Sequence, residues 1–156
     1  MTDIPDLTVS VQGDDFDVAQ LQSSLLLGAA EEGAIATFTG YVRVTNEARQ
    51  VNLLELEHYP GMTESSVLQI LQQAADRWPV RAASVVHRVG KLVPGDQIVW
   101  VGVSAAHRGE AFSACEFVMD FLKNRAPFWK KEWSPEGANW VSARQQDNTR
   151  AARWEE

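Results

Sequence analysis

The segment QIVWVGVSAAHRGEAFSACEFVMDFLKN, residues 97–124, contains the pattern that decides the fold class of this chain. Its first part is apolar and rich in valine, which predicts a strand over residues 97–104. After a polar loop, apolar residues recur every three or four positions over about residues 109–124, which predicts a helix. The inward positions of that helix are Phe112, Cys115, Met119 and Leu122. A strand that leads through a basic loop into a helix is typical of proteins in which helices pack on a sheet.

The rest of the chain shows the same alternation of strand and helix patterns. Strands are predicted at residues 7–12, 33–42, 51–58 and 83–89, and helices from about residue 17 and over residues 63–78, with Thr63 as the N-cap. Beyond Pro127, short aromatic pieces around the turn at residues 134–137 predict a terminal hairpin. Because glycine-rich phosphate loops are absent, the pattern favours an α/β or α+β sandwich over a wound nucleotide-binding fold.

Length and composition predict one domain with a substantial core, since the chain has 156 residues of which 45% are hydrophobic. We place this domain at residues 1–145 and treat residues 146–156 as a polar tail that is frayed or docks elsewhere. No apolar run reaches the length of a membrane span, and the first residues do not form a signal peptide. The expected location is the cytoplasm.

The net charge of −7 is unevenly distributed along the chain. All 14 lysine and arginine residues follow residue 42, whereas seven of the 21 acidic residues precede it. The body of the chain is therefore close to neutral, with local basic clusters. This distribution argues against binding along a nucleic-acid backbone but permits a pocket for a small anion.

The most pronounced basic cluster is MDFLKNRAPFWKKE, residues 119–132, in which cations alternate with large apolar side chains. The apolar residues can anchor the segment, whereas the cations need water or anionic partners. Its cations are Lys123, Arg125, Lys130 and Lys131. Residue spacing alone leaves two interpretations open, an anionic-substrate site and a solvated surface charge.

Three further positions are candidates for binding an anion. His107 and Arg108 precede a predicted helix, whose free N–H groups attract anions, and Arg43 ends a predicted strand. Lys123 lies at the far end of the same helix, so a fold neighbour or a second subunit must bring these groups together. Local roles for each of them, as a loop residue or a strand-end charge, remain open.

Other reactive residue types give weaker signals. His58 and His87 lie in predicted strands and are interpreted as structural, and the scattered histidines predict no metal site. Cys115 is interpreted as a buried thiol of the core. Trp129 and Trp133 flank two lysines and either pack in the fold or form a platform near a ligand.

Seven segments of the chain, in order, carry a resemblance to a known family. They are residues 38–43 (FTGYVR), 56–63 (LEHYPGMT), 87–90 (HRVG), 94–96 (PGD), 101–108 (VGVSAAHR), 119–123 (MDFLK) and 125–132 (RAPFWKKE). With these segments the chain resembles the catalytic (large) subunits of molybdopterin synthase. The resemblance covers about residues 33–145 and departs at Tyr41, where many members carry lysine, and at Lys131, where arginine is common.

The resemblance implies a fold, partners and an activity. The fold is an α/β hammerhead-type sandwich, and the assembly is a homodimer that becomes a heterotetramer with a small ubiquitin-like sulfur carrier. The carrier's Gly-Gly thiocarboxylate gives sulfur to cyclic pyranopterin monophosphate, which yields the dithiolene of molybdopterin. The enzyme is thus a sulfurtransferase, and no cofactor or metal is implied.

The resemblance also implies roles for individual residues. Lys123 and Lys130 match the catalytic lysines, and the remaining positions match substrate-binding residues. These are Arg43, His107, Arg108, Lys131, Glu132 and Arg144. Two rival interpretations use the same basic residues without catalysis: a binding module for a nucleotide or acidic peptide, and a structural scaffold.

Overall fold

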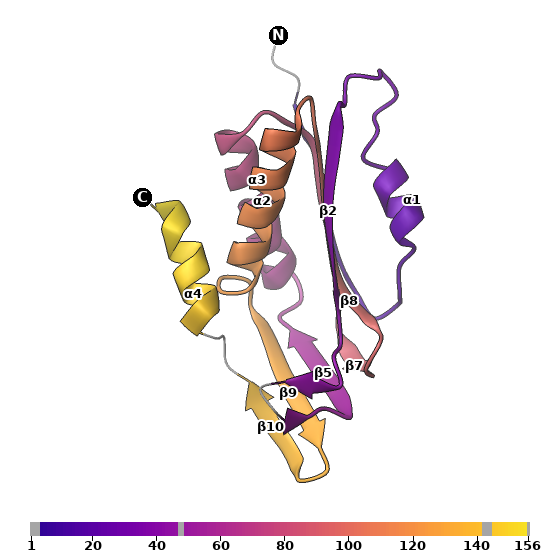
Figure 1. Ribbon diagram of the computed structural model, residues 1–156, viewed down its shortest axis with the longest axis vertical. Coiled ribbons are helices and arrows are strands. Elements are labelled where there is room, and N and C mark those ends of the chain that lie inside the picture. The colour runs from indigo at the N-terminus through magenta and orange to yellow at the C-terminus, as the bar shows by residue number, and fades with distance from the viewer. Residues whose placement is uncertain (1–3, 47–48, 142–144, 156) are drawn as a thin grey trace.

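The computed structural model describes residues 4–46, 49–141 and 145–155 and has an α+β architecture (Figure 1). The main sheet has four strands in the order β1-β6-β8-β2. Their bounds are Asp6–Gln12 for β1, Val80–Arg88 for β6, Gln97–Ala105 for β8 and Ala34–Tyr41 for β2. β1 runs parallel to β6, and the other two neighbouring pairs are antiparallel. The predicted strands are all present in this sheet or in the second one.

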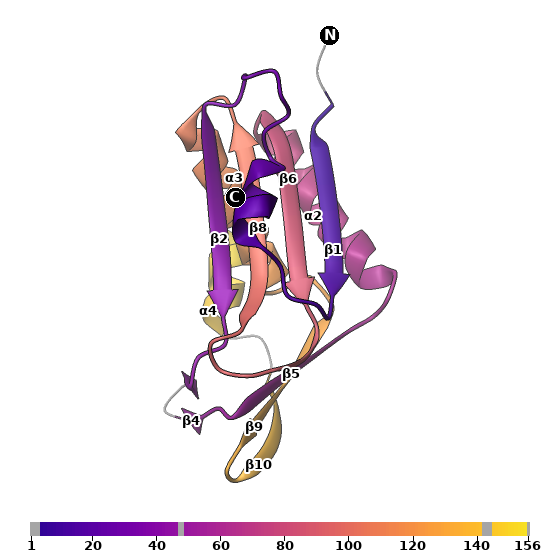
Figure 2. The same ribbon diagram turned by 90° about the vertical axis from the view of Figure 1, so that its right-hand side faces the viewer.

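Helices cover both faces of the main sheet (Figures 1 and 2). α2 (Met62–Arg77) and α3 (Arg108–Leu122) lie side by side on one face, and the short α1 (Val18–Ser23) lies on the other. Most valines of β6 and β8 are buried under α2 and α3, because both strands are central in the sheet. Each fully buried valine contributes about 1.5–3 kcal/mol to folding.

Trp100 is the largest side chain with no exposed surface, and it packs on the α1 side of the sheet with Leu25 and Val86. A glycine two residues later makes room for it. A Cβ atom at Gly102 would lie 2.4 Å from the Trp100 ring, closer than any side chain tolerates. The glycine therefore serves packing at this position.

A second, smaller antiparallel sheet lies beyond one end of the main sheet, in the order β10-β9-β5-β7 (Figure 1). Its strands are Gly137–Val141 (β10), Phe128–Ser134 (β9), Leu53–His58 (β5) and Gly90–Leu92 (β7), and the two-residue strands Thr45–Asn46 (β3) and Arg49–Gln50 (β4) pair beside it. The predicted terminal hairpin is β9–β10, but its pairing with β5 was not predicted. This sheet has its own small apolar core around Leu54, Leu56 and Leu92.

The start of α2 differs from the prediction. Gly61, with a φ of 87°, is the N-cap, and Thr63 already lies inside the helix. The buried Thr63 hydroxyl accepts a hydrogen bond from the Tyr59 N–H at 2.9 Å and donates one to the Pro127 carbonyl at 3.0 Å. Through these two hydrogen bonds, Thr63 links the start of α2 to the loop before β9.

The polar tail forms α4 (Gln145–Ala152) and a 3-10 turn (Arg153–Glu155), which dock on α3. The buried Asp120 carboxylate of α3 accepts hydrogen bonds from Arg150 at 3.1 Å, Arg153 at 2.8 Å and the Trp154 indole at 2.7 Å. The Trp154 ring also makes edge contacts with Trp78 and Phe117. These contacts hold α4 near the end of α3 that faces the second sheet.

Candidate active site

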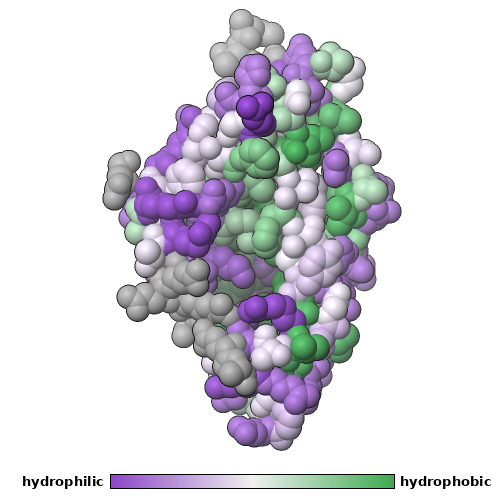
Figure 3. Space-filling model, in the orientation of Figure 1, coloured by the Kyte–Doolittle hydropathy of each residue, from purple (hydrophilic) through white to green (hydrophobic). Residues whose placement is uncertain are grey.

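The cavity lies between the main sheet, the end of α3 and the second sheet, and has a volume of about 600 Å³. Figure 3 shows the surface hollowed in this region, with hydrophilic side chains at its rim. Two sets of side chains form its wall, an apolar set and a polar set. The apolar set includes Phe38, Leu54, Leu56, Ile98, Met119 and Phe128, and the polar set includes Arg43, Asn46, His87, Lys123, Asn124, Lys130, Glu132 and Asp147.

Lys123 reaches the cavity because α3 ends there. It is the C-cap of α3, and its N–H still bonds to the Met119 carbonyl at 3.2 Å. The ammonium group is exposed, and a cation at a helix C-terminus complements the negative end of the helix dipole. The helix thus presents an amine to the cavity at a position that favours its charge.

Lys130 and Glu132 enter the cavity from β9. Residues two apart in a strand share a face, so both side chains point to the same side of the sheet. Glu132 is buried at 4% exposure, and its carboxylate accepts a hydrogen bond from the Asn46 amide. A buried carboxyl group with a hydrogen-bond partner therefore lies on the same face of β9 as Lys130.

Lys131, in contrast, does not line the cavity. It lies on the opposite face of β9, where its ammonium is 4.9 Å from the centre of the Trp133 ring and 5.3 Å from that of Trp140. The prediction that Lys131 shares the pocket with Lys130 therefore disagrees with the geometry of this chain. The cause is the alternation of side chains along a strand.

Arg43 follows the end of β2 and lines the cavity. Arg144 lies outside the described residues. The chain on either side of it does reach the cavity, because Val141 and Asp147 both line the wall.

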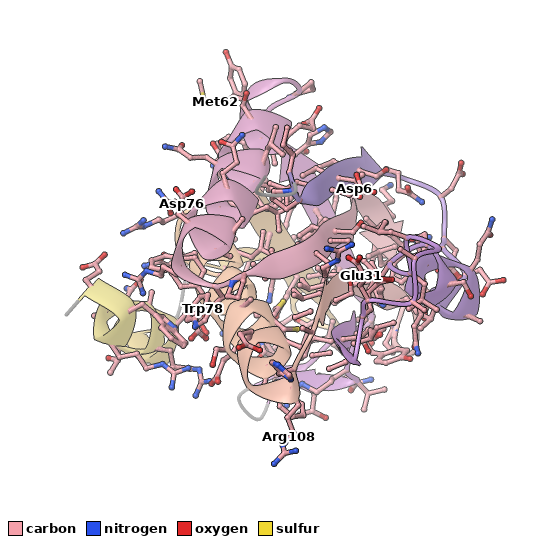
Figure 4. All side chains as sticks on the ribbon, turned by 90° about the horizontal axis from the view of Figure 1, so that it is seen from above. Asp6, Glu31, Met62, Asp76, Trp78 and Arg108 are labelled. Atoms are coloured by element: carbon pink, nitrogen blue, oxygen red, sulfur yellow. The ribbon has the colours of Figure 1, made fainter. Side chains whose placement is uncertain are left out.

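His107 and Arg108 do not line this cavity. Both are exposed at the start of α3, and Figure 4 shows Arg108 extending away from the body of the molecule. Lys123 lies 15 residues further along, which corresponds to about 22 Å of helix. Within one chain, the structure brings Arg43, Lys123 and Lys130 together but leaves His107 and Arg108 at the far end of α3.

His87 is a cavity residue that the sequence interpretation treated as structural only. It lies near the end of β6, and its ring stacks on Phe128 with 3.9 Å between ring centres. Burial, with the charges of Lys123, His58 and Lys130, lowers its pKa to about 4, although a hydrogen bond with the Arg88 carbonyl acts in the opposite direction. The imidazole is therefore neutral at physiological pH. Like Arg43, His87 lies near the end of a predicted strand, and that position is the signal in the sequence that marks it as a candidate.

Within the described part of the chain, no three histidine, cysteine, aspartate or glutamate residues gather in a way that could hold a metal ion. None of its helices is long and apolar enough to cross a membrane.

The fold and the cavity define an α+β protein in which two lysines and an arginine converge in the wall of one cavity. The family model described as MoaE protein matches residues 11–125, and the chain belongs to this family.

Individual relatives agree with this membership. The molybdopterin synthase catalytic subunit of Vibrio cholerae is 53% identical over 150 residues, which cover 96% of this chain and 99% of that protein. The solved structure of molybdopterin cofactor biosynthesis protein E from Burkholderia multivorans is 51% identical, with a TM-score of 0.82 over 97% of this chain and 98% of that one. A complex of subunits 1 and 2 of molybdopterin-converting factor from Helicobacter pylori shares the fold, at 19% identity and a TM-score of 0.67 over 90% of this chain and 91% of that one.

Proposed function

We propose that this protein is the catalytic subunit of a molybdopterin synthase and acts as a sulfurtransferase. It transfers sulfur from a thiocarboxylated carrier to cyclic pyranopterin monophosphate and so forms the dithiolene of molybdopterin. The observation that carries the proposal is the presence of Arg43, Lys123 and Lys130 in the wall of one cavity of about 600 Å³. That volume is within the range of sites for small organic ligands, and its wall combines cations with aromatic surface.

The sulfur has to come from a partner, because the chain has one cysteine and that thiol is unsuited to transfer. Cys115 is buried in α3, and burial, with a smaller effect of the Glu116 charge, raises its pKa to about 12. A thiol that stays protonated is a poor nucleophile. A thiocarboxylate on a small carrier protein supplies the sulfur already ionised, and the two-subunit complex of the Helicobacter pylori relative supports a partner of this kind.

The residues of the cavity have distinct roles in this reaction. Arg43 binds the phosphate, since a guanidinium forms paired hydrogen bonds with phosphate oxygens. Lys123 transfers protons or briefly holds a reactant covalently while the carbon–sulfur bond forms. Lys130 stabilises the negative charge that develops at the thiocarboxylate or the leaving oxygen. Glu132 holds the Asn46 segment in place by accepting its amide hydrogen bond.

The carrier's extended C-terminus is expected to approach along the apolar surface of Phe128 and Trp129. Phe128 lines the cavity, whereas Trp129, which is 47% exposed, is the next residue of β9 and lies on its opposite face, so Phe128 is the one of the two that can contact the tail inside the cavity. Extended peptide ends are commonly recognised by such grooves. The predicted location of the reaction is the cytoplasm.

A second copy of the chain is expected to complete each site. His107 and Arg108 are too far from Lys123 to act with it in the same chain. A homodimer in which the start of one α3 lies at the cavity of the other chain would bring them to the substrate. The edge strand β2, with Phe38 and Tyr41 exposed beside the cavity, offers an apolar surface for such a contact.

The test is to incubate the purified protein with thiocarboxylated carrier and cyclic pyranopterin monophosphate and to detect the dithiolene product by mass spectrometry. The wild-type protein should form it, and Lys123→Ala should form none while keeping its fold and its carrier binding. Binding of substrate without any product would instead support the non-catalytic binding module. Normal turnover by Lys123→Ala would contradict the assignment of Lys123.

A further inference from the structure

The loop that carries His107 and Arg108 is short. β8 ends at Ala105 and α3 begins at Arg108, so only Ala106 and His107 connect the strand to the helix. His107 is the N-cap, and its carbonyl accepts a hydrogen bond from the Ala111 N–H at 3.3 Å, whereas its side chain makes no capping hydrogen bond. Because the loop has no spare residue, a shift of the backbone at Ala106 moves His107 and the start of α3 with it.

Gly33 lies against this loop, immediately before β2, whose start is beside the end of β8 (Figure 2). Its N–H donates a hydrogen bond to the Ala105 carbonyl at 3.0 Å. A Cβ atom at position 33 would lie 2.1 Å from the carbonyl oxygen of Ala106 and 3.2 Å from its carbonyl carbon. The φ of Gly33 is outside the left-handed region, so its backbone conformation does not require glycine. The close approach to Ala106 is the feature that requires it.

The residues before Gly33 are anchored to the body of the protein. The Glu32 side chain is 1% exposed, and its carboxylate accepts a hydrogen bond from the Leu27 N–H at 2.8 Å and lies 3.6 Å from the Arg81 guanidinium of β6. The Glu31 carboxylate lies 2.5 Å from the same guanidinium. Since this side is fixed and the loop after β8 is exposed, an atom added to the glycine would displace the loop.

We infer that Gly33 is a positioning residue for His107 and Arg108, because the absence of a side chain at position 33 sets the backbone path of the loop that carries them. The role rests on the proposed function and on the dimer described with it, in which these two residues act on the cavity of the second chain. Neither Gly33 nor Ala106 lines the cavity of its own chain. A substitution at Gly33 should therefore damage the partner's site and spare the site of its own chain.

The first test is the kinetics of Gly33→Ala in the sulfur-transfer assay. Its kcat/KM for cyclic pyranopterin monophosphate should fall about 10- to 100-fold, mainly through KM, because hydrogen bonds to a charged group are lost. Gly109→Ala is the matched control, since a Cβ atom there meets no atom within 4 Å and the residue directly follows Arg108. Its rate should stay within about twofold of wild type. A wild-type KM in Gly33→Ala would overturn the proposal.

Mixed dimers separate this role from a general loss of structure. A dimer of one Gly33→Ala chain and one Lys123→Ala chain has one intact site, so random assembly should restore about one quarter of the wild-type rate. A mixture of Gly33→Ala with Arg108→Ala should stay as slow as its components, because neither chain supplies a working loop. Rescue by Arg108→Ala, or no rescue by Lys123→Ala, would overturn the proposal, since Gly33 would then act on the site of its own chain.

A second measurement does not depend on activity. In amide ¹H–¹⁵N spectra, Gly33→Ala should shift the resonances of Ala106, His107 and Arg108 most and leave those of Lys123 and Lys130 unchanged. An unfolded variant, or shifts spread over the whole spectrum, would overturn the proposal because the strain would then not be confined to the loop. The expected shifts together with an inactive wild-type protein would refute the proposed function alone.

Discussion

Lys130 and Lys131 are adjacent in the chain but lie on opposite faces of β9. Lys130 lines the cavity, whereas Lys131 is held over the rings of Trp133 and Trp140. The sequence places the two lysines in one basic cluster, but the pleat of the strand puts their side chains on opposite faces.

Replacement of the two lysines should therefore have unequal effects. Lys130→Ala should reduce the rate of dithiolene formation by about 100-fold or more, as expected when one donor to a developing charge is removed. Lys131→Ala should leave the rate within about threefold of wild type and cost about 0.5–1 kcal/mol of stability through its lost ring contacts. Single-turnover assays and urea unfolding measure the two effects. Similar rate losses in both variants would contradict the assignment of faces.

Mixed dimers can test whether His107 and Arg108 act on the partner's cavity. When Lys123→Ala and Arg108→Ala chains are combined, a mixed dimer has one intact site only if Arg108 acts across the interface. Random assembly should then restore about one quarter of the wild-type rate, since half of the dimers are mixed and each contains one intact site. Each variant alone is the control. A mixture as inactive as its components would show that Arg108 does not act in this way.

The low pKa of His87 predicts that the protein loses stability in mild acid. The pKa falls from 6.5 in the unfolded chain to about 4 in the folded one. Between these values the unfolded state binds more protons, so the free energy of unfolding decreases as the pH falls from about 6.5 to about 4, by at most about 3 kcal/mol. Urea unfolding at several pH values measures this decrease. His87→Gln should show a smaller decrease across the window, and an identical one would exclude His87 as its cause.

The docking of α4 should depend on Asp120. Burial alone would raise the pKa of this carboxyl, but hydrogen bonds from Trp154, Arg153 and Arg150 outweigh it and hold the pKa below its usual value. Asp120→Asn removes the charge that these donors share and should lower the free energy of unfolding by about 1–3 kcal/mol. It should also expose the tail to proteolysis.

The matched control for Asp120 is Glu116→Gln. Glu116 is exposed and bonds the same two arginines, so its loss should cost less than about 1 kcal/mol. Urea unfolding and limited proteolysis of the two variants provide the comparison. If Glu116→Gln lowered the free energy of unfolding as much as Asp120→Asn, burial of the carboxylate would not be what stabilises the docking of α4.

Much of the secondary structure follows from the sequence because it depends on local periodicity. The valine-rich apolar run at residues 97–104 and the helical spacing that follows correspond to β8 and α3 within a few residues. The predictions from sequence are wrong where a distant segment determines what a residue does. Thr63 has the chemistry of an N-cap, but it lies inside α2 and its hydroxyl donates a hydrogen bond to the Pro127 carbonyl. The tail is polar in sequence, and it docks because its side chains donate hydrogen bonds to the Asp120 carboxylate of α3.

The sequence by itself determined the fold class, the family and the candidate lysines, because residue type and spacing are properties of the chain that need no distant contacts. Only the tertiary structure decided which of these groups share a cavity. Lys123 ends a helix, Lys130 lies on one face of a strand and Arg43 follows another strand, and their convergence depends on how two sheets and α3 pack. The same packing turned Lys131 away, left His107 and Arg108 at the far end of α3, and placed the neutral ring of His87 in the same cavity wall as Lys123.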